Sequence, residues 1–214
     1  MVEKVKKHWD LVLVGGIGLT LAIVGVLIMS GMAVSPGSVL AATSTATVTV
    51  TATVEPWINI GVSTTSVALT PSLVDSLGNT YVGSSTVIDV NVGTNNSTGW
   101  TVNIKGTNNG LYKSAAPTST IASVTGTSTI TAGNDGYGAN ATSVLAGTTV
   151  GSYYNYWATT TVGEIKTGGQ TFATTSAPNA LQNVVDMKVY ATATSTKPSG
   201  SYSDDIILTA TTNI

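Results

Sequence analysis

The side chains that could carry out acid–base or metal chemistry in this chain are few. Asp204 and Asp205 form the only adjacent carboxylate pair. Consecutive residues of a strand point to opposite faces, so these two carboxylates cannot share one substrate as general acid and base, and we interpret them as a solvated edge. The sequence Asn134-Asp135-Gly136 offers one carboxylate, whereas Ca²⁺ takes about six to eight oxygen ligands. We interpret this sequence as a plain turn.

Residue types exclude most catalytic mechanisms. Nucleophilic and acid–base catalysis use His, Cys or carboxylates tuned by their neighbours, yet the chain has no Cys and its only His is His8, near the N-terminus. We therefore expect a non-enzymatic protein without a cofactor or a bound metal. Arg is also absent, and the few lysines form no basic patch after the first ten residues, so nucleic acid is not an expected partner.

The strongest candidate for a binding surface is a run of aromatic residues. It comprises Tyr153, Tyr154, Tyr156 and Trp157. Aromatic rings in a loop can hold sugars or anchor a protein interface, so a polysaccharide or another protein is the expected partner of this run. The alternative is that the run packs over one end of the domain as a lid on its core.

A strand at the centre of the fold is predicted around Trp100. Residues 100–105 alternate strictly, with Trp100, Val102 and Ile104 on one face, which is the pattern of a half-buried strand. Trp57 begins another alternating run, residues 57–62. We predict that these four residues belong to the structural core, because a buried Trp contributes the largest apolar surface of any side chain.

Further alternating stretches predict an antiparallel β-sandwich over residues 42–214. The strands are expected at residues 46–54, 86–92, 184–191 and 202–211. Residues 86–92 are expected to form a hairpin with the Trp100 strand, and Val185, Met187 and Val189 to share the inner face of theirs. Residues 108–180, rich in Ser, Thr and Gly, show a weaker pattern, and we interpret them as an insertion. With no Cys for disulfides, the core itself must stabilise the domain.

The first 41 residues have the order of a secretory signal peptide. Three lysines come first, residues 11–34 carry no charge, and small residues follow up to Ala41. Cleavage between Ala41 and Ala42 would release a secreted or cell-surface protein. The alternative is an uncleaved helix, since about 20 apolar residues suffice to span a bilayer, and this helix would be the protein's only contact with the membrane.

Part of the chain resembles the bacterial WxL-type cell-wall surface domains. The resemblance rests on Gly99-Trp100-Thr101-Val102, on the strand at 184–191 and on the Pro198-Ser199-Gly200 turn before the last strand. It implies an immunoglobulin-like β-sandwich and non-covalent association with the cell wall. The chain differs from the family pattern in having Val102 where Leu is usual, and it lacks the second Trp motif, where Leu208-Thr209-Ala210 stands instead.

Two function classes follow from these observations. The first is a secreted or cell-surface structural and adhesive domain, associated with the cell wall. The alternative is the subunit of a fibre or pilus, in which Ala46–Val54 inserts into the sheet of a neighbouring copy by strand addition. This segment is uncharged and alternates Val or Ala with Thr, but a strand that pairs within its own sheet would have the same sequence pattern.

Overall fold

The computed structural model describes residues 44–157 and 159–214, and the chain divides into two units, Met1–Ala52 and Thr53–Ile214. The expected N-terminal helix and the cleavage point between Ala41 and Ala42 lie outside the described residues. In the described part of the chain there is no helix with the length and apolarity needed to cross a bilayer. Residues 44–52 are exposed and belong to no strand.

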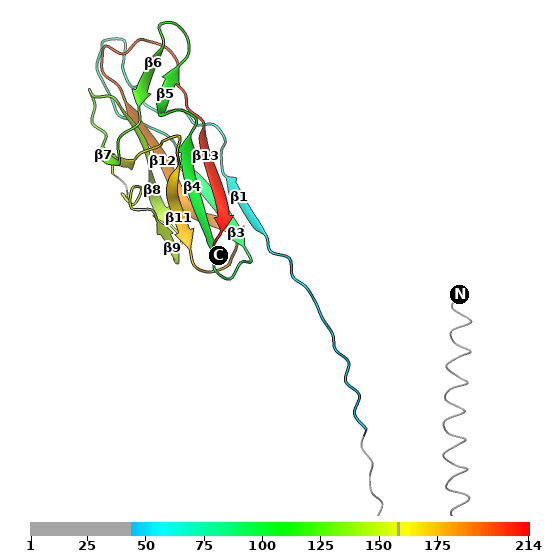
Figure 1. The fold of residues 1–214 in the computed structure, drawn as a ribbon. Coiled ribbons are helices and arrows are strands. Elements are labelled where there is room, and N and C mark those ends of the chain that lie inside the picture. Colours follow the sequence, from blue (N-terminus) through cyan, green and yellow to red (C-terminus); the bar gives the residue numbers. More distant parts are fainter. Residues whose placement is uncertain (1–43, 158) are drawn as a thin grey trace, which may run out of the picture. The chain divides into compact units, whose positions relative to one another are not determined.

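The second unit is all-β, with every strand pair antiparallel (Figure 1). Its larger sheet contains, in spatial order, β1 (Ile58–Val62), β3 (Ile88–Thr94), β12 (Asn179–Thr192), β8 (Gly136–Val144), β10 (Thr161–Gly163) and β7 (Thr127–Thr129), with β2 (Gly83–Ser84) beside β12. Its smaller sheet contains β13 (Ile206–Thr212), β4 (Trp100–Gly106), β11 (Gln170–Thr175) and β9 (Thr148–Val150). A separate pair is formed by β5 (Gly110–Lys113) and β6 (Ser119–Ala122). The expectation of an all-β, antiparallel fold is therefore confirmed.

The core lies between the two larger sheets. Trp100, Val102 and Ile104 of β4 are completely buried and join one apolar cluster with residues of β3, β8, β11 and β12. Val185, Met187 and Val189 of β12 belong to the same cluster, on the inner face where their alternation placed them. β4 pairs with β13 on one side and β11 on the other, so the strand that carries Trp100 is interior to its sheet.

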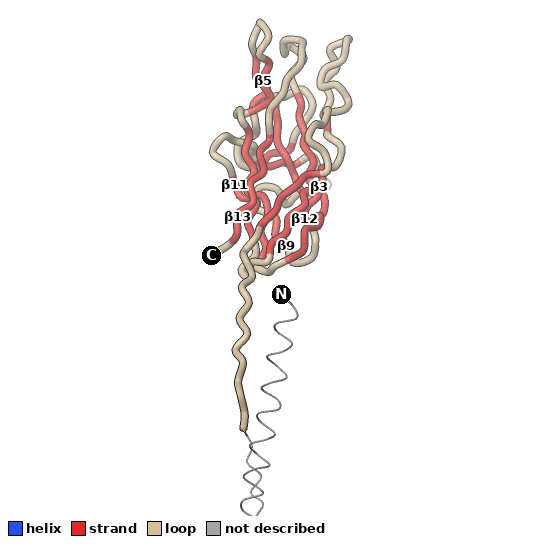
Figure 2. Tube along the Cα trace, turned by 90° about the vertical axis from the view of Figure 1, so that its right-hand side faces the viewer, coloured by secondary structure: helices blue, strands red, loops and turns tan. Residues whose placement is uncertain are grey.

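The predicted hairpin between residues 86–92 and the Trp100 strand is wrong. β3 pairs with β1 and β12, whereas β4 pairs with β13 and β11, so the turn between β3 and β4 crosses from one sheet to the other. Figure 2 shows β3 and β12 on one side of this unit and β11 and β13 on the other. Both strands have an apolar face, and facing each other across the core buries both faces, which pairing side by side does not.

One glycine makes this crossing possible. Gly99 has a φ of 78°, and a Cβ at this position would lie 2.2 Å from the carbonyl oxygen of Thr175. Only glycine fits both the backbone conformation and the close approach.

Residues 108–180 are not an insertion. They supply β5 to β11. Among these strands, β8 lies inside the larger sheet and β11 inside the smaller one. The sequence of β8 is rich in Gly and Ala, whose small side chains give little hydropathy contrast between the two faces of a strand. Small size is nevertheless required there, because a Cβ on Gly138 would lie 2.5 Å from the carbonyl oxygen of Gly163.

The predictions for residues 46–54 and Trp57 need correction. Residues 46–54 belong to no strand, and Val48, Val50 and Val54 are exposed. Trp57 lies just before β1 and is 43% exposed, so it is not a core residue. Residues 46–54 have no neighbouring strand among the described residues, whereas Trp57 lies on the face of its run opposite to Ile58 and Ile60, which pack against the core.

Candidate functional site

The aromatic run is a loop between β9 and β10 whose members have different surroundings. Tyr154 is completely buried, Tyr156 is half-buried, and Tyr153 and Trp157 are 43% and 41% exposed. The structure thus separates the two alternatives considered for this run. Tyr154 packs into the core, whereas Tyr153 and Trp157 present apolar rings to solvent.

Tyr154 anchors the loop to the core. Its ring packs edge-on against Phe172 of β11, with the ring centroids 5.2 Å apart, and its hydroxyl donates a hydrogen bond of 2.5 Å to the carbonyl oxygen of Glu164. Burial, followed by the negative charge of Glu164, raises the pKa of the Tyr154 hydroxyl above its ordinary value. The phenol therefore stays protonated at neutral pH and serves as a hydrogen-bond donor to the backbone, not as an acid or a base.

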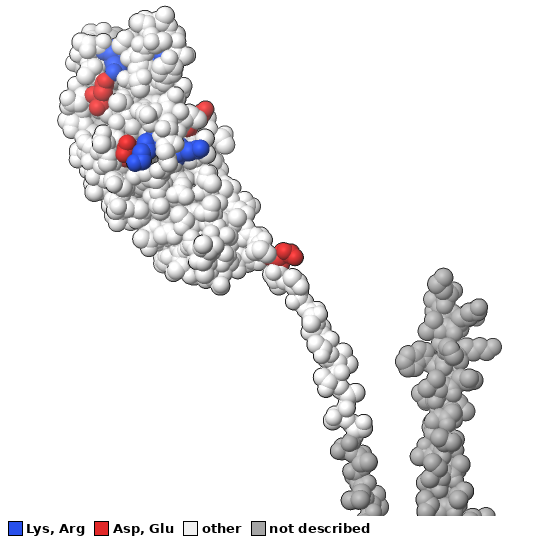
Figure 3. Space-filling model, viewed as in Figure 1, with Lys and Arg blue, Asp and Glu red and all other residues white. Residues whose placement is uncertain are grey.

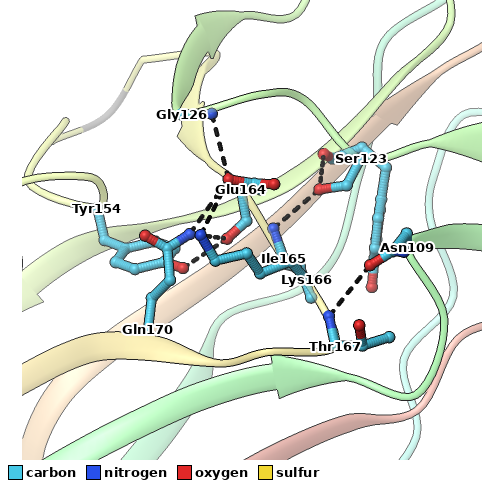
Figure 4. A network of polar contacts seen from close by, with 10 residues as sticks. Asn109, Ser123, Gly126, Tyr154, Glu164, Ile165, Lys166, Thr167 and Gln170 are labelled. Carbon is cyan, nitrogen blue, oxygen red and sulfur yellow. Dashed lines mark hydrogen bonds and ion pairs between the residues drawn. The ribbon is translucent and has the colours of Figure 1, made fainter.

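Glu164 is the centre of the polar network drawn in Figure 4. Its carboxylate accepts hydrogen bonds from the backbone N–H of Gly126 at 3.3 Å and from Gln170 Nε2 at 3.5 Å, and lies 3.6 Å from Lys166 Nζ. The ion pair is open to solvent and contributes about 0–1 kcal/mol. The network joins the segment after β10 to the loop before β7 and to the start of β11.

Neighbouring hydrogen bonds extend this network toward β8. The Ser123 hydroxyl accepts from the backbone N–H of Ile165 at 2.8 Å and donates to the carbonyl oxygen of Tyr137 at 3.2 Å. Asn109 Oδ1 accepts from the backbone N–H of Thr167 at 3.1 Å. Each of these groups satisfies a backbone partner, so the network in Figure 4 holds loops together and presents no free nucleophile.

The two adjacent carboxylates do not form a site. Asp204 Oδ1 accepts hydrogen bonds from the backbone N–H of Asn108 at 2.9 Å and the hydroxyl of Thr107 at 3.0 Å, while Asp205 is exposed. The Tyr137 hydroxyl lies 3.4 Å from Asp204 Oδ2, and burial, followed by this negative charge, raises the pKa of Tyr137. Asp204 therefore caps the turn after β4.

Asp135 also has a structural role. Its carboxylate accepts a hydrogen bond from the backbone N–H of Thr194 at 3.1 Å and pairs with the ammonium group of Lys197. These contacts tie the turn before β8 to the loop after β12. Within residues 44–157 and 159–214, no cluster of three or more metal-ligating side chains occurs.

Asp75 is the clearest case of a tuned carboxylate, and it too orders a turn. Its two oxygens accept hydrogen bonds from the backbone N–H groups of Leu77 and Asn79, the Asn79 side chain and the Tyr81 hydroxyl, at 2.8–3.0 Å. The hydrogen bond from the Asn79 side chain, followed by the backbone ones, lowers the pKa of Asp75 to about 2. A carboxylate this acidic is a poor general base at neutral pH.

A hollow of about 200 Å³ lies beside β7 and β8, lined by Ile130, Asn134, Asp135 and Thr192 among others. The hydroxyl of Thr192 is buried there without a hydrogen-bond partner in the described part of the chain. The volume is below the range of about 300–1,000 Å³ that is typical of sites for organic ligands. It is large enough for water.

Comparison with protein-family models, with curated proteins and with solved structures finds no match for this chain. The candidate surfaces must therefore be judged from their own geometry. Two remain: the exposed rings of Tyr153 and Trp157, and the outer edge of β13 together with the segment Ala46–Val54, neither of which has a strand partner within residues 44–157 and 159–214.

The sequence pattern indicates the aromatic loop but not the edge at β13. The edge strand has a sequence signal, since Ile206–Thr212 contains neither a charged residue nor Pro. This signal shows only that β13 lacks the usual protection of an edge strand, and its place at the edge is set by the order of the strands in the sheet.

Proposed function

We propose that this chain is a non-enzymatic structural protein of the cell surface. The observation that carries the proposal is the order of its parts: a basic, then apolar, then small-residue sequence over residues 1–41, followed by a Thr-rich, Cys-free, all-β unit. Such an order suits an exported protein whose stability comes from its core. The carboxylates described above accept hydrogen bonds that order turns and loops, which supports a structural role over a catalytic one.

The experiment that tests this proposal is the intact mass of the native protein in membrane, wall, medium and cytoplasmic fractions. We expect a species that begins at Ala42 in the wall or the medium. A species that retains residues 11–34 in the membrane would make this a tethered surface protein. Recovery of the unprocessed chain in the cytoplasm would contradict export and, with it, the proposed function.

The finer architecture that we propose is an immunoglobulin-like sandwich of the WxL type. It is supported by two sheets that enclose one core and by the central place of the Trp100 strand in the smaller sheet. The resemblance to WxL-type domains makes cell-wall polysaccharide the first candidate partner, and the exposed rings of Tyr153 and Trp157 are the surface best suited to a sugar face.

Wall binding is tested by co-sedimentation of the full chain with purified cell-wall material. The combined change Tyr153→Ala and Trp157→Ala removes both exposed rings and leaves the anchoring Tyr154 in place. The matched control is Tyr112→Ala, which removes a ring of similar exposure, 40%, from β5. We expect the double variant to lose binding and the control to retain it. Equal binding by both variants would exclude the aromatic loop.

The second candidate function is the subunit of a fibre or pilus. The specific observation in its favour is that Ala46–Val54, although it has the most regular alternation in the chain, has no strand partner in the part of the chain that the structure describes. An uncharged, unpaired segment of this kind is suited to strand addition between copies. An SDS-resistant ladder of the isolated protein would support this function, and its absence would favour the monomeric surface domain.

A further inference from the structure

Among the described residues, no strand is hydrogen-bonded to the outer edge of β13 in the smaller sheet, although β1 of the larger sheet lies close to it. β13 pairs with β4 alone among the described strands. At its two ends, the N–H of Thr107 donates to the carbonyl oxygen of Asp205, and the N–H of Asn213 donates to the carbonyl oxygen of Gly99. These two bonds show which residues of the strand have backbone groups that point toward β4. In an antiparallel ladder every second residue bonds to the same neighbour. The backbone groups that point to the open edge therefore belong to Ile206, Leu208, Ala210 and Thr212.

This edge lacks the protection that proteins normally give to exposed strands. Edge strands are usually short, or carry Lys, Pro or a bulge. β13 has seven residues, none of them charged or Pro, and its register with β4 is continuous. The other edge strands are shorter: β1 has five residues, and β7 and β9 have three each. β13 is thus the longest free edge available for pairing.

The core is incompletely covered along the same margin. Ile206, Leu208 and Ala210 point inward and pack against the core cluster, yet they are only half-buried. Ile58 and Ile60 of β1, which flanks β13 in Figure 1, are half-buried as well. In the same view, Figure 3 shows few charged side chains over the surface of this unit. A strand added to β13 would cover apolar surface without burying charge.

The segment Ala46–Val54 matches this edge in pattern and length. Its Val48, Val50, Ala52 and Val54 form one face and its threonines form the other. β13 likewise has Ile206, Leu208 and Ala210 on its inner face, and Ile207, Thr209 and Thr211 on its outer face. At about 3.3 Å per residue, nine residues extend about 30 Å, enough to cover the roughly 23 Å of β13. No residue of the segment is Pro, so each can donate a backbone hydrogen bond.

The hydrogen bonds of residues 55–57 favour pairing with another copy over pairing with the segment's own domain. Asn95 accepts a bond from the backbone N–H of Trp57 at 2.9 Å and donates one to the carbonyl oxygen of Glu55 at 2.8 Å, so its side chain acts as a strand partner for this stretch. Thr94 donates a further bond to the Trp57 carbonyl at 2.6 Å. These contacts keep residues 55–57 aligned with the β1–β3 pair, away from a turn back to β13.

We infer that Ala46–Val54 of one copy adds as a strand to the free edge of β13 in a second copy, with Val48, Val50, Ala52 and Val54 facing inward. The inference rests on the proposed function, since it supplies the contact by which a surface subunit would assemble. The segment and the edge lie on different elements of each copy, so the contact is head-to-tail and extends into a fibre when it does not close into a ring.

Cysteine cross-linking tests the inference, because the chain has no Cys of its own. One full-length chain carries a single cysteine on the outer face of the segment, at Thr47, Thr49, Thr51 or Thr53, and a second full-length chain, enlarged by a tag, carries Thr209→Cys. The backbone groups of the outer-face residues of β13 bond to β4. In an antiparallel addition, these residues would therefore oppose the segment in non-hydrogen-bonded pairs, whose Cα atoms lie about 4.5 Å apart, a distance that disulfides accept.

After mixing and mild oxidation, we expect a mixed dimer, with one or two positions of the segment far more efficient than the others. The control chain carries Ser128→Cys on β7, another edge strand, and should cross-link at least about tenfold less. Equal yields at Thr209→Cys and Ser128→Cys would overturn the inference. The inference would also be overturned if a chain with both Thr209→Cys and one segment cysteine formed only the intramolecular disulfide.

A matched pair of charge variants provides a second test. Val50→Asp places a carboxylate on the inward face of the added strand, whereas Thr51→Asp places the same charge one residue away on the outer face. Because a buried unpaired charge is strongly unfavourable, we expect Val50→Asp to lower the mixed-dimer yield by about tenfold or more and Thr51→Asp to retain most of it. Equal effects would contradict the proposed orientation.

This test is independent of the location of the protein. Cross-linking that fails in a protein recovered from the wall or the medium would remove the strand-addition contact and leave the surface function in place. Recovery of unprocessed chain in the cytoplasm would remove the surface function whatever the cross-linking result.

Discussion

The segment Ala46–Val54 and strand β4 have the same kind of sequence and opposite surroundings. Both alternate apolar and polar residues without a break. In β4 the apolar residues Trp100, Val102 and Ile104 are completely buried, whereas Val50 in the segment is 86% exposed. The comparison teaches that alternation defines the two faces of a potential strand but does not provide the neighbour with which it pairs.

Three sets of contacts hold β4 in place that the segment lacks. β4 has a partner strand on each side, β13 and β11, and the opposite sheet covers its apolar face. The indole N–H of Trp100 donates a hydrogen bond of 2.7 Å to Asn179 Oδ1 of β12, and Asn179 Nδ2 donates to the carbonyl oxygen of Val92 in β3 at 2.8 Å. The following predictions test how much each set contributes.

The largest effect is expected from Trp100→Ala. Removing a completely buried Trp leaves a cavity in the core and should lower the free energy of unfolding by about 3–5 kcal/mol. In a domain of this size that corresponds to a fall in Tm on the order of 10 °C, measured by thermal denaturation followed by circular dichroism. The control is Trp157→Ala in the aromatic loop, which should change Tm little. A small effect of Trp100→Ala would show that β4 is not the anchor of the core.

A smaller loss is expected from Asn179→Ala. The indole N–H of Trp100 and the carbonyl oxygen of Val92 would both lose a partner in a partly buried place, at a cost of about 1–3 kcal/mol for an unsatisfied buried group. The measurement is urea denaturation. Asn183→Ala, on the same strand but with an exposed hydrogen bond, serves as the control and should cost less. Equal losses would show that the hydrogen bonds of Asn179 between the two sheets stabilise the fold no more than the exposed hydrogen bond of Asn183 does.

A local effect is expected at the Asp75 turn when the pH falls. This turn is ordered by hydrogen bonds at the surface, and its folded-state pKa of about 2 lies below the ordinary 3.8. The ionised carboxylate therefore stabilises the turn fully above pH 3.8, and this stabilisation is lost as the pH falls through about 2. The backbone amide signals of Leu77 and Asn79 in NMR should therefore titrate near pH 2. A midpoint near pH 4 would contradict the hydrogen-bonded carboxylate.

The smallest effect on stability is expected from Val50→Ala. The residue has no core contact in the folded chain, so the free energy of unfolding of the separate subunit should change by no more than about 0.5 kcal/mol. Thermal denaturation of dilute protein checks this, and Ile104→Val in β4, at about 0.5–1.5 kcal/mol, gives the contrast. A loss for Val50→Ala as large as that for Ile104→Val would show that the segment packs within its own subunit.

Sequence patterns identified several strands and their inner faces. The predictions at residues 184–191 and 202–211 correspond to β12 and β13, and the alternation around Trp100 correctly placed three residues in the core. The same patterns were misleading for Trp57, which lies just outside β1, and for the pairing of β3 with β4. Hydropathy describes one strand at a time, so it contains no information about which strands become neighbours.

The aromatic run shows the same limit at the level of a candidate site. Its four residues form one composition signal, yet Tyr154 turns into the core while Tyr153 and Trp157 stay at the surface. The contacts of Tyr154 with Phe172 and with the carbonyl oxygen of Glu164 decide which ring is buried, and both partners lie after β10 in the sequence, outside the aromatic run. No local pattern distinguishes these rings.

By itself, the sequence determined that the chain has no Cys for disulfides and no His after His8, and its alternation predicted the all-β, antiparallel fold class. These properties depend on residue types and on period-two alternation, which are local. Only the tertiary structure decided that β3 and β4 face each other across the core, that residues 108–180 contribute strands to both sheets, and that, among the described residues, the outer edge of β13 and the segment Ala46–Val54 have no strand partner. Each of these depends on long-range strand pairing, in which packing of apolar faces selects one arrangement among several that the local patterns allow.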